Sequence, residues 1–397
     1  MIPPLYDHQR KIINDNKLKC GLFLGTGSAK TRTALELAEG ATLVICPKQQ
    51  REDKTWQFNA EKFGIIVNLT VISKEELRRD WQLLPHYDTV IVDECFTNET
   101  EILTDKGFKV FNKLDKTEKI AQWNNFKISF VKPLRYIEKD YDGQMVSFNV
   151  KKGINVLMTP NHDQVLVNYR SREIVKKPIS QCSFHQLWRL PTSGFSIEKS
   201  ELLTPLERMY IATQADGSIH NILKNHTTVA FTFFKKRKID RLLKLISEAG
   251  LEFSFVKHDK VRHRARIMVK MPTNTTKDIR NHISYPMSSE KAAEIIEEMV
   301  EWDGHRIKGG RQYYFSSNDK NQSDFYAQVA VLAGHRCYQS VEKDERKETF
   351  SDMNRLYISL NSQSEDTQKC KKKYTKYKGK VYCVEVPSGA IVIRHKG

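Results

Sequence analysis

The stretch VIVDECFTNET, residues 90–100, divides the sequence into two parts with different patterns. Before it, short apolar runs alternate with helix-like segments, which is typical of an α/β domain. After it, short β-like segments follow one another with polar turns between them, which is typical of an all-β unit. The change of pattern directly after Glu94 predicts that a separate unit begins at Cys95.

The length and composition predict several globular domains. The chain has 397 residues and 39% hydrophobic content, so we expect about two to four domains. The sequence contains no long apolar run and no signal-peptide pattern at its N-terminus, so we expect no membrane span and a cytoplasmic location. The seven cysteines are scattered without metal-ligand spacing, which argues against a disulfide scaffold.

The charge is distributed unevenly along the chain. The formal net charge is +17, and residues 1–94 hold equal numbers of basic and acidic residues, so the whole excess lies in 95–397. A basic surface on one part of a chain favours a polyanionic partner for that part, such as double-stranded DNA. The alternative is a lysine-rich face that is simply solvated.

The loop GTGSAKT, residues 25–31, lies between an apolar strand-like run and an amphipathic helix-like run. This is the order of elements that a phosphate-binding P-loop requires. Backbone N–H groups of such a loop, together with the N-terminus of the next helix, bind phosphate oxygens. We therefore expect Gly25 and Gly27 to let the loop approach ATP, Lys30 to reach its β- and γ-phosphates, and Thr31 to bind Mg²⁺.

The loop departs from the P-loop pattern at Leu24 and Ala29, where the pattern has Gly, so an ordinary Gly-rich turn is the alternative. A second apolar strand-like run, YDTVIVDE over 87–94, ends in two acids, as a Walker B motif does. In that context we expect Asp93 to hold Mg²⁺ and Glu94 to polarise the attacking water. The alternative is a buried strand with an acidic exit.

These motifs resemble the first motor domain of a superfamily 2 helicase, of the kind related to chromatin remodellers and phage helicases. The resemblance covers residues 1–94 and implies part of a RecA-like α/β domain that binds ATP. It also implies that Gln9 contacts adenine, although a lone Gln is more often a surface residue. The later helicase motifs do not occur in the sequence, so a complete helicase is not expected. The resemblance implies a bacterial or phage-infected cytoplasm.

The residues from Cys95 onward resemble an intein, a self-splicing domain of the Hint type. Cys95 with its polar continuation resembles the opening block, and the Thr-x-x-His motif from Thr159 resembles the second block. The strand-like run around Cys383 resembles a later block. The resemblance implies an all-β splicing domain formed by residues 95–195 and 366–397.

The residue types suit the chemistry of splicing. The Cys95 thiolate would attack the carbonyl of Glu94 and convert the amide into a thioester. His162 would protonate the leaving nitrogen, Thr159 would steady the charge on the carbonyl, and Cys383 would assist later proton transfers. The alternative is that the Thr-x-x-His motif is a hydrogen-bonded loop and that both cysteines are small buried side chains.

A pseudo-repeat lies between the two β-rich ends. Residues 206–217 and 293–304 each form a helix-like run that ends in Asp-Gly, followed by strand-like runs and a helix that ends in Ala-Gly. The pattern resembles the LAGLIDADG homing endonucleases in their single-chain form with two motifs. The resemblance implies an α+β endonuclease domain over 196–365 that is monomeric and has two pseudo-symmetric halves.

The resemblance also implies an active site. It places Asp216 and Asp303 together, where they would bind Mg²⁺ for cleavage of double-stranded DNA. The alternative for each Asp-Gly pair is a helix stop with Gly in a left-handed cap. A basic residue is expected in the centre, and Lys257, Lys270 and Lys320 are the candidates.

The sequence thus predicts a multidomain protein, namely a helicase precursor that is interrupted by an intein, and the intein carries an endonuclease. One alternative is an ATP-dependent DNA motor with a regulatory DNA-binding insert, and another is a site-specific nuclease with inactive splicing ends. The sequence stops at Gly397, before the Asn that closes an intein. We therefore expect cleavage at the N-side junction without ligation.

Overall fold

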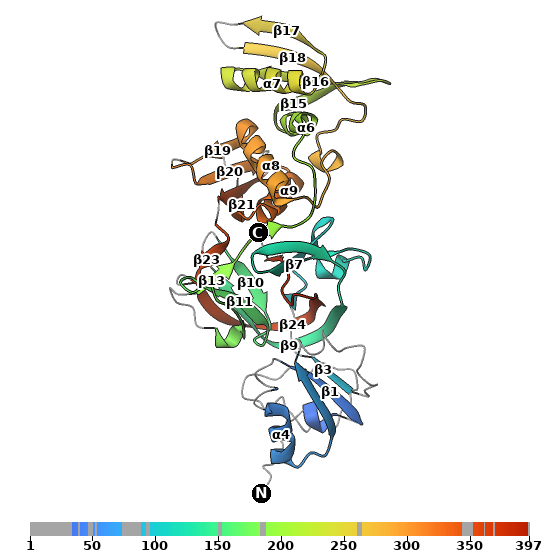
Figure 1. Cartoon of the computed structure of the whole chain (residues 1–397), viewed down its shortest axis with the longest axis vertical. Coiled ribbons are helices and arrows are strands. Elements are labelled where there is room, and N and C mark those ends of the chain that lie inside the picture. Colours follow the sequence, from blue (N-terminus) through green and yellow to red (C-terminus); the bar gives the residue numbers. More distant parts are fainter. Residues whose placement is uncertain are drawn as a thin grey trace.

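The computed structural model arranges its units along one long axis, with the N-terminus at one end (Figure 1). A small α/β unit lies at the bottom of the view, a β-rich body lies above it, and two helix-and-sheet units lie at the top. The structure describes residues 34–38, 40–46, 51, 54–73, 89–92, 96–149, 153–182, 188–259, 264–307, 309–343, 352–360, 362–367 and 370–395.

The N-terminal unit contains a parallel sheet with the strand order β2-β1-β3. Helix α4, Thr55–Phe63, packs on this sheet through Trp56 and Ala60. The P-loop candidate at 25–31, Gln9, and the acids Asp93 and Glu94 lie outside the described residues. The strands are β1, Ala41–Cys46, β2, Asn68–Ser73, and β3, Thr89–Val92.

The β-rich body is organised by one long antiparallel pair of strands. Strand β9, Arg135–Asn149, pairs along its whole length with β24, Lys371–Glu385. Strands β10, Asn155–Met158, and β4, Phe96–Thr97, close a barrel with them. The pairing joins segments from either side of the two upper units, so the β-rich body is assembled from two distant parts of the sequence.

Two further sheets complete the β-rich body. One has the order β14-β8-β7-β5-β25, with β6 paired to β5, and the other has the order β12-β11-β13-β23. The strands of the first sheet are β5, Thr100–Thr104, β6, Gly107–Val110, β7, Ile120–Asn124, β8, Lys127–Val131, β14, Phe195–Ser196, and β25, Ile393–His395. Those of the second are β11, Asp163–Asn168, β12, Ile174–Pro178, β13, Trp188–Pro191, and β23, Ser364–Asp366.

The two upper units have the same topology. Their sheets have the orders β15-β16-β18-β17 and β19-β20-β22-β21, so each strand has a counterpart at the same place in the other unit. The first unit consists of α6, Pro205–Asp216, β15, Gly217–Ile222, β16, Thr227–Phe233, α7, Lys236–Glu248, β17, Phe253–Asp259, and β18, Arg264–Met271. The second consists of α8, Ser289–Trp302, β19, Gly304–Arg306, β20, Gln312–Ser317, α9, Lys320–Leu332, β21, Arg336–Glu342, and β22, Met353–Ser359.

Local sequence signals fix the starts of the two central helices. Thr204 caps α6 in a reciprocal capping box with Glu207, and Pro205 occupies the first turn, where its missing N–H costs nothing. Ser288 caps α8 by accepting a hydrogen bond from the Lys291 N–H. Both helices therefore begin at defined residues and run to the Asp-Gly pairs.

Ion pairs join α6, α7 and α8 across the two repeats. Glu298 on α8 is fully buried and accepts hydrogen bonds from Arg208, Arg241 and the Trp302 indole. Lys291 on α8 donates to Glu207 on α6 over 2.6 Å. A buried carboxylate is tolerated only when such donors replace its water shell, so these contacts hold the two repeats in one relative position.

The described part of the chain is thus mixed α/β and consists largely of sheet. No described helix is both long enough and apolar enough to cross a membrane. The boundaries 1–94, 95–195, 196–365 and 366–397 stay predictions.

Replacement of the buried Glu298 by Gln should destabilise the upper units, because two guanidinium groups would face a neutral amide. We expect E298Q to lower the free energy of unfolding by about 2–4 kcal/mol. Urea denaturation followed by circular dichroism measures the change. The matched control is E301Q, since the Glu301 side chain is 38% exposed, and it should cost less than about 1 kcal/mol. Equal effects of the two variants would contradict the structural role of Glu298.

Candidate functional site

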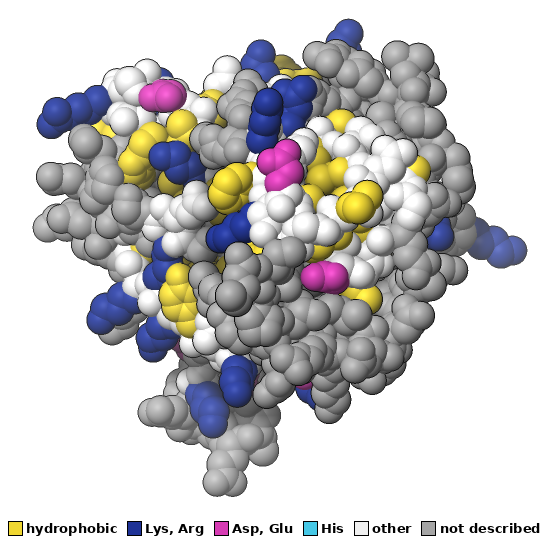
Figure 2. Space-filling model, turned by 90° about the horizontal axis from the view of Figure 1, so that it is seen from below, with side chains coloured by type: hydrophobic (Ala, Val, Ile, Leu, Met, Phe, Trp, Pro, Cys, Tyr) yellow, Lys and Arg dark blue, Asp and Glu magenta, His cyan; other side chains and the backbone are white. Residues whose placement is uncertain are grey.

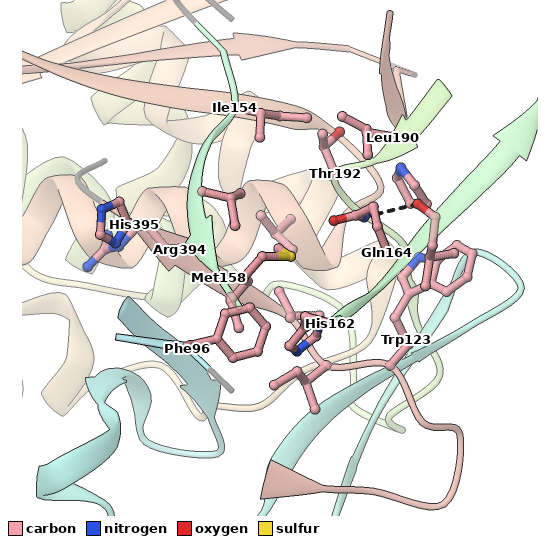
Figure 3. A pocket seen from close by; sticks show the side chains of 18 of the residues that line it. Phe96, Trp123, Ile154, Met158, His162, Gln164, Leu190, Thr192, Arg394 and His395 are labelled. Carbon is pink, nitrogen blue, oxygen red and sulfur yellow. Dashed lines mark hydrogen bonds between the residues drawn. The ribbon is translucent and has the colours of Figure 1, made fainter. Parts of the chain in front are cut away.

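A cavity of about 280 Å³ lies between the β-rich body and the second repeat. Its walls are mostly apolar and include Phe96, Met158 and Leu190. Figure 3 shows His162 beside Phe96 and Met158, with Arg394 and His395 on the opposite side. The cavity is lined by His162 and Cys383, and a histidine and a cysteine at one cavity are suited to proton transfer and nucleophilic chemistry on the backbone.

His162 is held in one orientation at this cavity. Its backbone N–H donates to the Thr159 carbonyl over 3.0 Å, which closes a tight turn after β10. Its Nδ1 lies 3.1 Å from the carbonyl oxygen of Asp163, and a carbonyl can only accept, so Nδ1 carries a proton. The ring packs against Phe96 with 4.1 Å between the centroids. The imidazole is therefore positioned next to the first described residue after Cys95.

Thr159 and Cys383 reach the same region from different strands. Thr159 directly follows β10 and is 3% exposed. Cys383 is half-buried in β24, directly after Tyr382, and Tyr382 pairs with Phe96. Cys383 and His162 both line the cavity. Cys95 directly precedes Phe96 in the sequence and lies outside the described residues.

The other described cysteines are poor nucleophiles. Burial raises the pKa of Cys182 to about 11 and that of Cys370 to about 11. Burial also raises the pKa of Cys337 to about 12. A thiol with such a pKa is almost wholly protonated at neutral pH, so these three side chains act as apolar packing groups.

Sequence reasoning did not single out a chain of hydroxyl groups that leads to His395. The Thr97 and Thr100 Oγ1 atoms lie 3.3 Å apart, and Thr100 Oγ1 lies 3.2 Å from His395 Nδ1. His395 is 4% exposed and lines the cavity. The sequence signal for His395 was its position at the end of an apolar strand-like run. A histidine with a purely structural role can occupy the same position.

The repeat brings two carboxylates together. Asp216 is the last residue of α6, and Asp303 caps the C-terminus of α8. Both face the ammonium of Lys238, whose Nζ lies 2.5 Å from Asp216 Oδ2 and 3.9 Å from Asp303 Oδ1. The two Asp-Gly motifs, far apart in the sequence, thus share one charged centre.

The environment disfavours the charge on Asp303. Burial raises the pKa of Asp303, and the nearby Asp216 carboxylate adds to this increase. Lys238 and Lys277 act in the opposite direction without cancelling it. A carboxylate that is held close to another carboxylate gains from any further cation, which is typical of metal-binding and catalytic acids.

The glycines after the two acids are required for close packing. A Cβ on Gly217 would lie 2.7 Å from the Thr213 carbonyl oxygen, and one on Gly304 would lie 2.6 Å from the Val300 Cα. Gly217 has a φ of −76°, so the left-handed cap that was the alternative for this Asp-Gly pair does not occur there. Each glycine instead lets a strand begin directly against the helix that carries the acid.

The basic residue at the centre is Lys238, which differs from the candidates chosen from the sequence. Lys270 pairs with Glu252 over 2.6 Å, and Lys320 pairs with Asp324 over 2.6 Å. The Lys257 side chain lies outside the described atoms. Lys238 was hidden in the basic run at the start of α7, where sequence alone ranks no lysine above its neighbours.

The acid pair and Lys238 fit a divalent cation that also binds a phosphate. The described residues contain no cluster of three or more His, Cys, Asp or Glu side chains that would enclose a metal. Mg²⁺ is commonly held by one or two carboxylates together with water and phosphate oxygens. A cavity of about 10 Å³ beside Asp303, lined also by Gln214 and Tyr326, has room for about one water molecule.

Basic side chains also lie away from the acid pair and Lys238. On the lower face, Lys and Arg side chains are distributed across the described surface and do not form one patch (Figure 2). On the outward face of β18, Arg266 and Lys270 alternate with buried residues. Arg266 thus adds a positive charge to the exposed face of that sheet, whereas Lys270 is paired with Glu252.

The chain is similar in sequence to one curated protein over most of its length. It is 30% identical over 340 residues to the ribonucleoside-diphosphate reductase subunit beta of Aquifex aeolicus (strain VF5), which covers 76% of this chain and 49% of that protein. The chain thus spans about half the length of this curated relative. Residues 1–94 make up less than a quarter of the chain, so most of the aligned residues lie after Glu94. No protein-family model matches the chain.

Three solved structures share limited similarity with the chain. A splice-inactive variant of the AceL NrdHF class 3 split intein has 18% identity and a TM-score of 0.22, covering 24% of this chain and 62% of that one. I-DmoI in complex with DNA and Mn has 15% identity and a TM-score of 0.29, covering 39% and 89%. Full-length WhiA from Thermatoga maritima has 9% identity and a TM-score of 0.29, covering 41% and 53%.

The comparisons correct the assignment of the chain to an intein-bearing, phage-like superfamily 2 helicase. The curated relative is a reductase subunit, so the helicase precursor and the ATP-dependent motor are wrong. The helicase assignment was wrong because it rested on two short motifs. The loop at 25–31 lacks Gly at Leu24 and Ala29, and a short apolar strand with an acidic end occurs in many unrelated sheets.

Replacement of Asp303 by Asn should stabilise the chain near neutral pH. The folded-state pKa of Asp303 is raised, so its ionised form opposes folding above that pKa, and the penalty disappears as the pH falls. We expect D303N to raise the Tm by about 1–3 °C at pH 7 and to have little effect at pH 4. Thermal denaturation with a chelator present measures this. A lower Tm at pH 7 would show that the contact with Lys238 outweighs burial.

Proposed function

We propose that the two upper repeats form a metal-dependent endonuclease for double-stranded DNA. The observation that carries the proposal is the convergence of Asp216, Asp303 and Lys238 from two repeats of the same topology. Two carboxylates and an ammonium at one point are suited to phosphodiester hydrolysis, in which negative charge develops on phosphate oxygens. A bound divalent ion would activate water and neutralise the leaving oxygen.

The residues of this chain have distinct parts in that reaction. Asp216 and Asp303 would hold the ion, because their carboxylates face one point at the ends of α6 and α8. Lys238 would remain beside them and donate to a phosphate oxygen, since its Nζ already lies between the two acids. The outward face of β18, with Arg266 and Lys270, would contact the DNA backbone.

Loss of either acid should abolish DNA cleavage while the fold persists. We expect D216N and D303N to reduce cleavage of duplex DNA by roughly a hundredfold or more in Mg²⁺ or Mn²⁺. The substrate is a plasmid library, and the products are mapped by sequencing their ends. E301Q is the matched control, because Glu301 lies two residues before Asp303 and contacts Arg306 instead of the centre. Equal cleavage by D216N and the unchanged chain would reject the proposal.

The basic sheet face should make DNA binding depend on salt. We expect the double variant R266Q/K270Q to weaken binding to a random duplex and to reduce the slope of log affinity against log salt by about 1–2. Fluorescence anisotropy at several salt concentrations measures the slope. The control variant K236Q changes an exposed lysine that pairs with Asp240 on α7. An unchanged slope in R266Q/K270Q would place the DNA elsewhere.

We propose a second activity, self-cleavage of the chain at Cys95, for the β-rich body. The observation that favours it is the oriented His162 at a cavity that also contains Cys383 and borders Phe96. The Cys95 thiol would pass its proton to Nε2 of His162, because Nδ1 donates to the Asp163 carbonyl, and the sulfur would bond to the Glu94 carbonyl carbon. His162 would then give this proton to the Cys95 nitrogen as the amide C–N bond breaks, which leaves a thioester and a free amine. An added thiol would exchange with the thioester and release residues 1–94.

The self-cleavage proposal predicts a defined fragment. With an added thiol, mass spectrometry should detect residues 1–94 as a thioester, and Cys95→Ala should give none. His162→Ala should slow release by roughly a hundredfold or more, because the proposed reaction would lose its proton carrier. His226→Ala is the control, since His226 contacts Asn225 at an exposed turn. A chain that stays intact under thiol would rule out this activity.

A further inference from the structure

Arg394 joins the β-rich body to the second repeat. It lies in β25, and its Nη1 and Nη2 donate to the two carboxylate oxygens of Asp324 on α9 over 2.7 and 3.2 Å. Its Nε donates to Glu101 on β5 over 2.7 Å. Its Nη1 also donates to Gln339 on β21 over 3.0 Å. One guanidinium thus bridges two units that are separated in the sequence.

The bridge is shielded from solvent. The Arg394 side chain is 8% exposed and the Asp324 side chain is 17% exposed. The guanidinium also stacks on Phe108, 4.3 Å from the ring centroid. Bidentate pairs in such surroundings hold a fixed geometry, unlike exposed ion pairs, which exchange readily with water.

The charges on both partners are stabilised by the contact. Burial alone would lower the pKa of Arg394, but the carboxylates of Asp324 and Glu101 hold it above its usual value. Burial alone would raise the pKa of Asp324, but Arg394, Lys320 and Gln339 bring it below its usual value. Both groups therefore remain charged across the neutral range, so the bridge does not depend on pH there.

The position of β25 determines the position of groups at the candidate self-cleavage site. Arg394 pairs with Glu101 and His395 pairs with Thr100 in the antiparallel ladder with β5. His395 contacts Thr100, which contacts Thr97, and Thr97 follows Phe96 at the wall of the cavity. A displacement of β25 would move His395 and this hydroxyl chain together.

We propose that the second repeat holds β25 in place through the Arg394–Asp324 bridge and thereby sets the geometry of the self-cleavage site. Arg394 is then a positioning residue and Asp324 is its anchor. The inference rests on the proposed self-cleavage at Cys95. The second repeat would then have a structural role in self-cleavage that does not involve the acids Asp216 and Asp303.

Asp324→Asn is the informative change, because it removes the charge and keeps the size of the side chain. We expect thiol-induced release of residues 1–94 to slow by roughly tenfold in D324N, since a small misplacement of reacting groups has a large kinetic cost. Backbone amides of Ile393–His395 should exchange with deuterium roughly tenfold faster. D324E, which keeps the charge, should restore part of both losses.

Two controls separate the bridge from general destabilisation. K320Q removes another partner of Asp324 without touching Arg394. E342Q breaks a pair with Arg355 in the same repeat, 3.0 Å apart, away from β25. Both should release the fragment at the unchanged rate. DNA cleavage by D324N should also be unchanged, because Asp324 contacts Arg394, Gln339 and Lys320, whereas the acid pair contacts Lys238.

The two readouts distinguish failure of this inference from failure of the proposed activity. Slow release with fast exchange at β25 in D324N supports the inference. Unchanged exchange in D324N overturns it, whatever the release rate. Fast exchange with unchanged release shows that the bridge does not set the site, and also overturns it. If the unchanged chain gives no fragment at all, the self-cleavage proposal fails, and this inference fails with it.

Discussion

The pairing of β9 with β24 is the constraint on which the rest of the molecule depends. These strands come from either side of the two repeats, and their ladder runs from Arg135 to Asn149 without a break. Because the ladder pairs each residue of β9 with a residue of β24, the chain that leaves after β14 must return before β23 at the same place. The pairing of Pro191 with Ser364 shows how closely the exit and the return lie together. The candidate cavity is formed by that closure.

Charged groups in this protein serve both structure and chemistry. Glu298 and Asp303 both lie near the C-terminal end of α8. Glu298 accepts hydrogen bonds from surrounding donors, whereas Asp303 is buried near another carboxylate. The first arrangement contributes to stability, and the second opposes it. Such a contrast is typical of a protein whose stable packing holds its reactive groups in an arrangement that is itself unfavourable. The fixed packing around Glu298 allows the pair Asp216 and Asp303 to persist despite their repulsion.

Part of this molecule could be predicted from its sequence. The repeated Asp-Gly and Ala-Gly endings identified the repeat, because helix ends and close approaches demand particular small residues. The resemblance of the Thr-x-x-His motif to an intein block pointed to His162, which lines the cavity, and its role stays a prediction. Lys238 and His395 could not be found, since their roles depend on where α7 and β25 pack. The helicase assignment failed because a few residues at 25–31 and 87–94 carry little information without the sheet that surrounds them.

The connectivity of the β-rich body has a consequence for how the chain folds during synthesis. Strand β9 leaves the ribosome long before β24, and the entire pair of repeats is made in the interval. The sheet of each repeat pairs only strands of that repeat, so the repeats can fold as soon as they emerge, whereas β9 must wait with an unpaired edge. Closure of the barrel is therefore a late step. Until it occurs, the nascent chain carries an open strand edge that a neighbouring chain could capture.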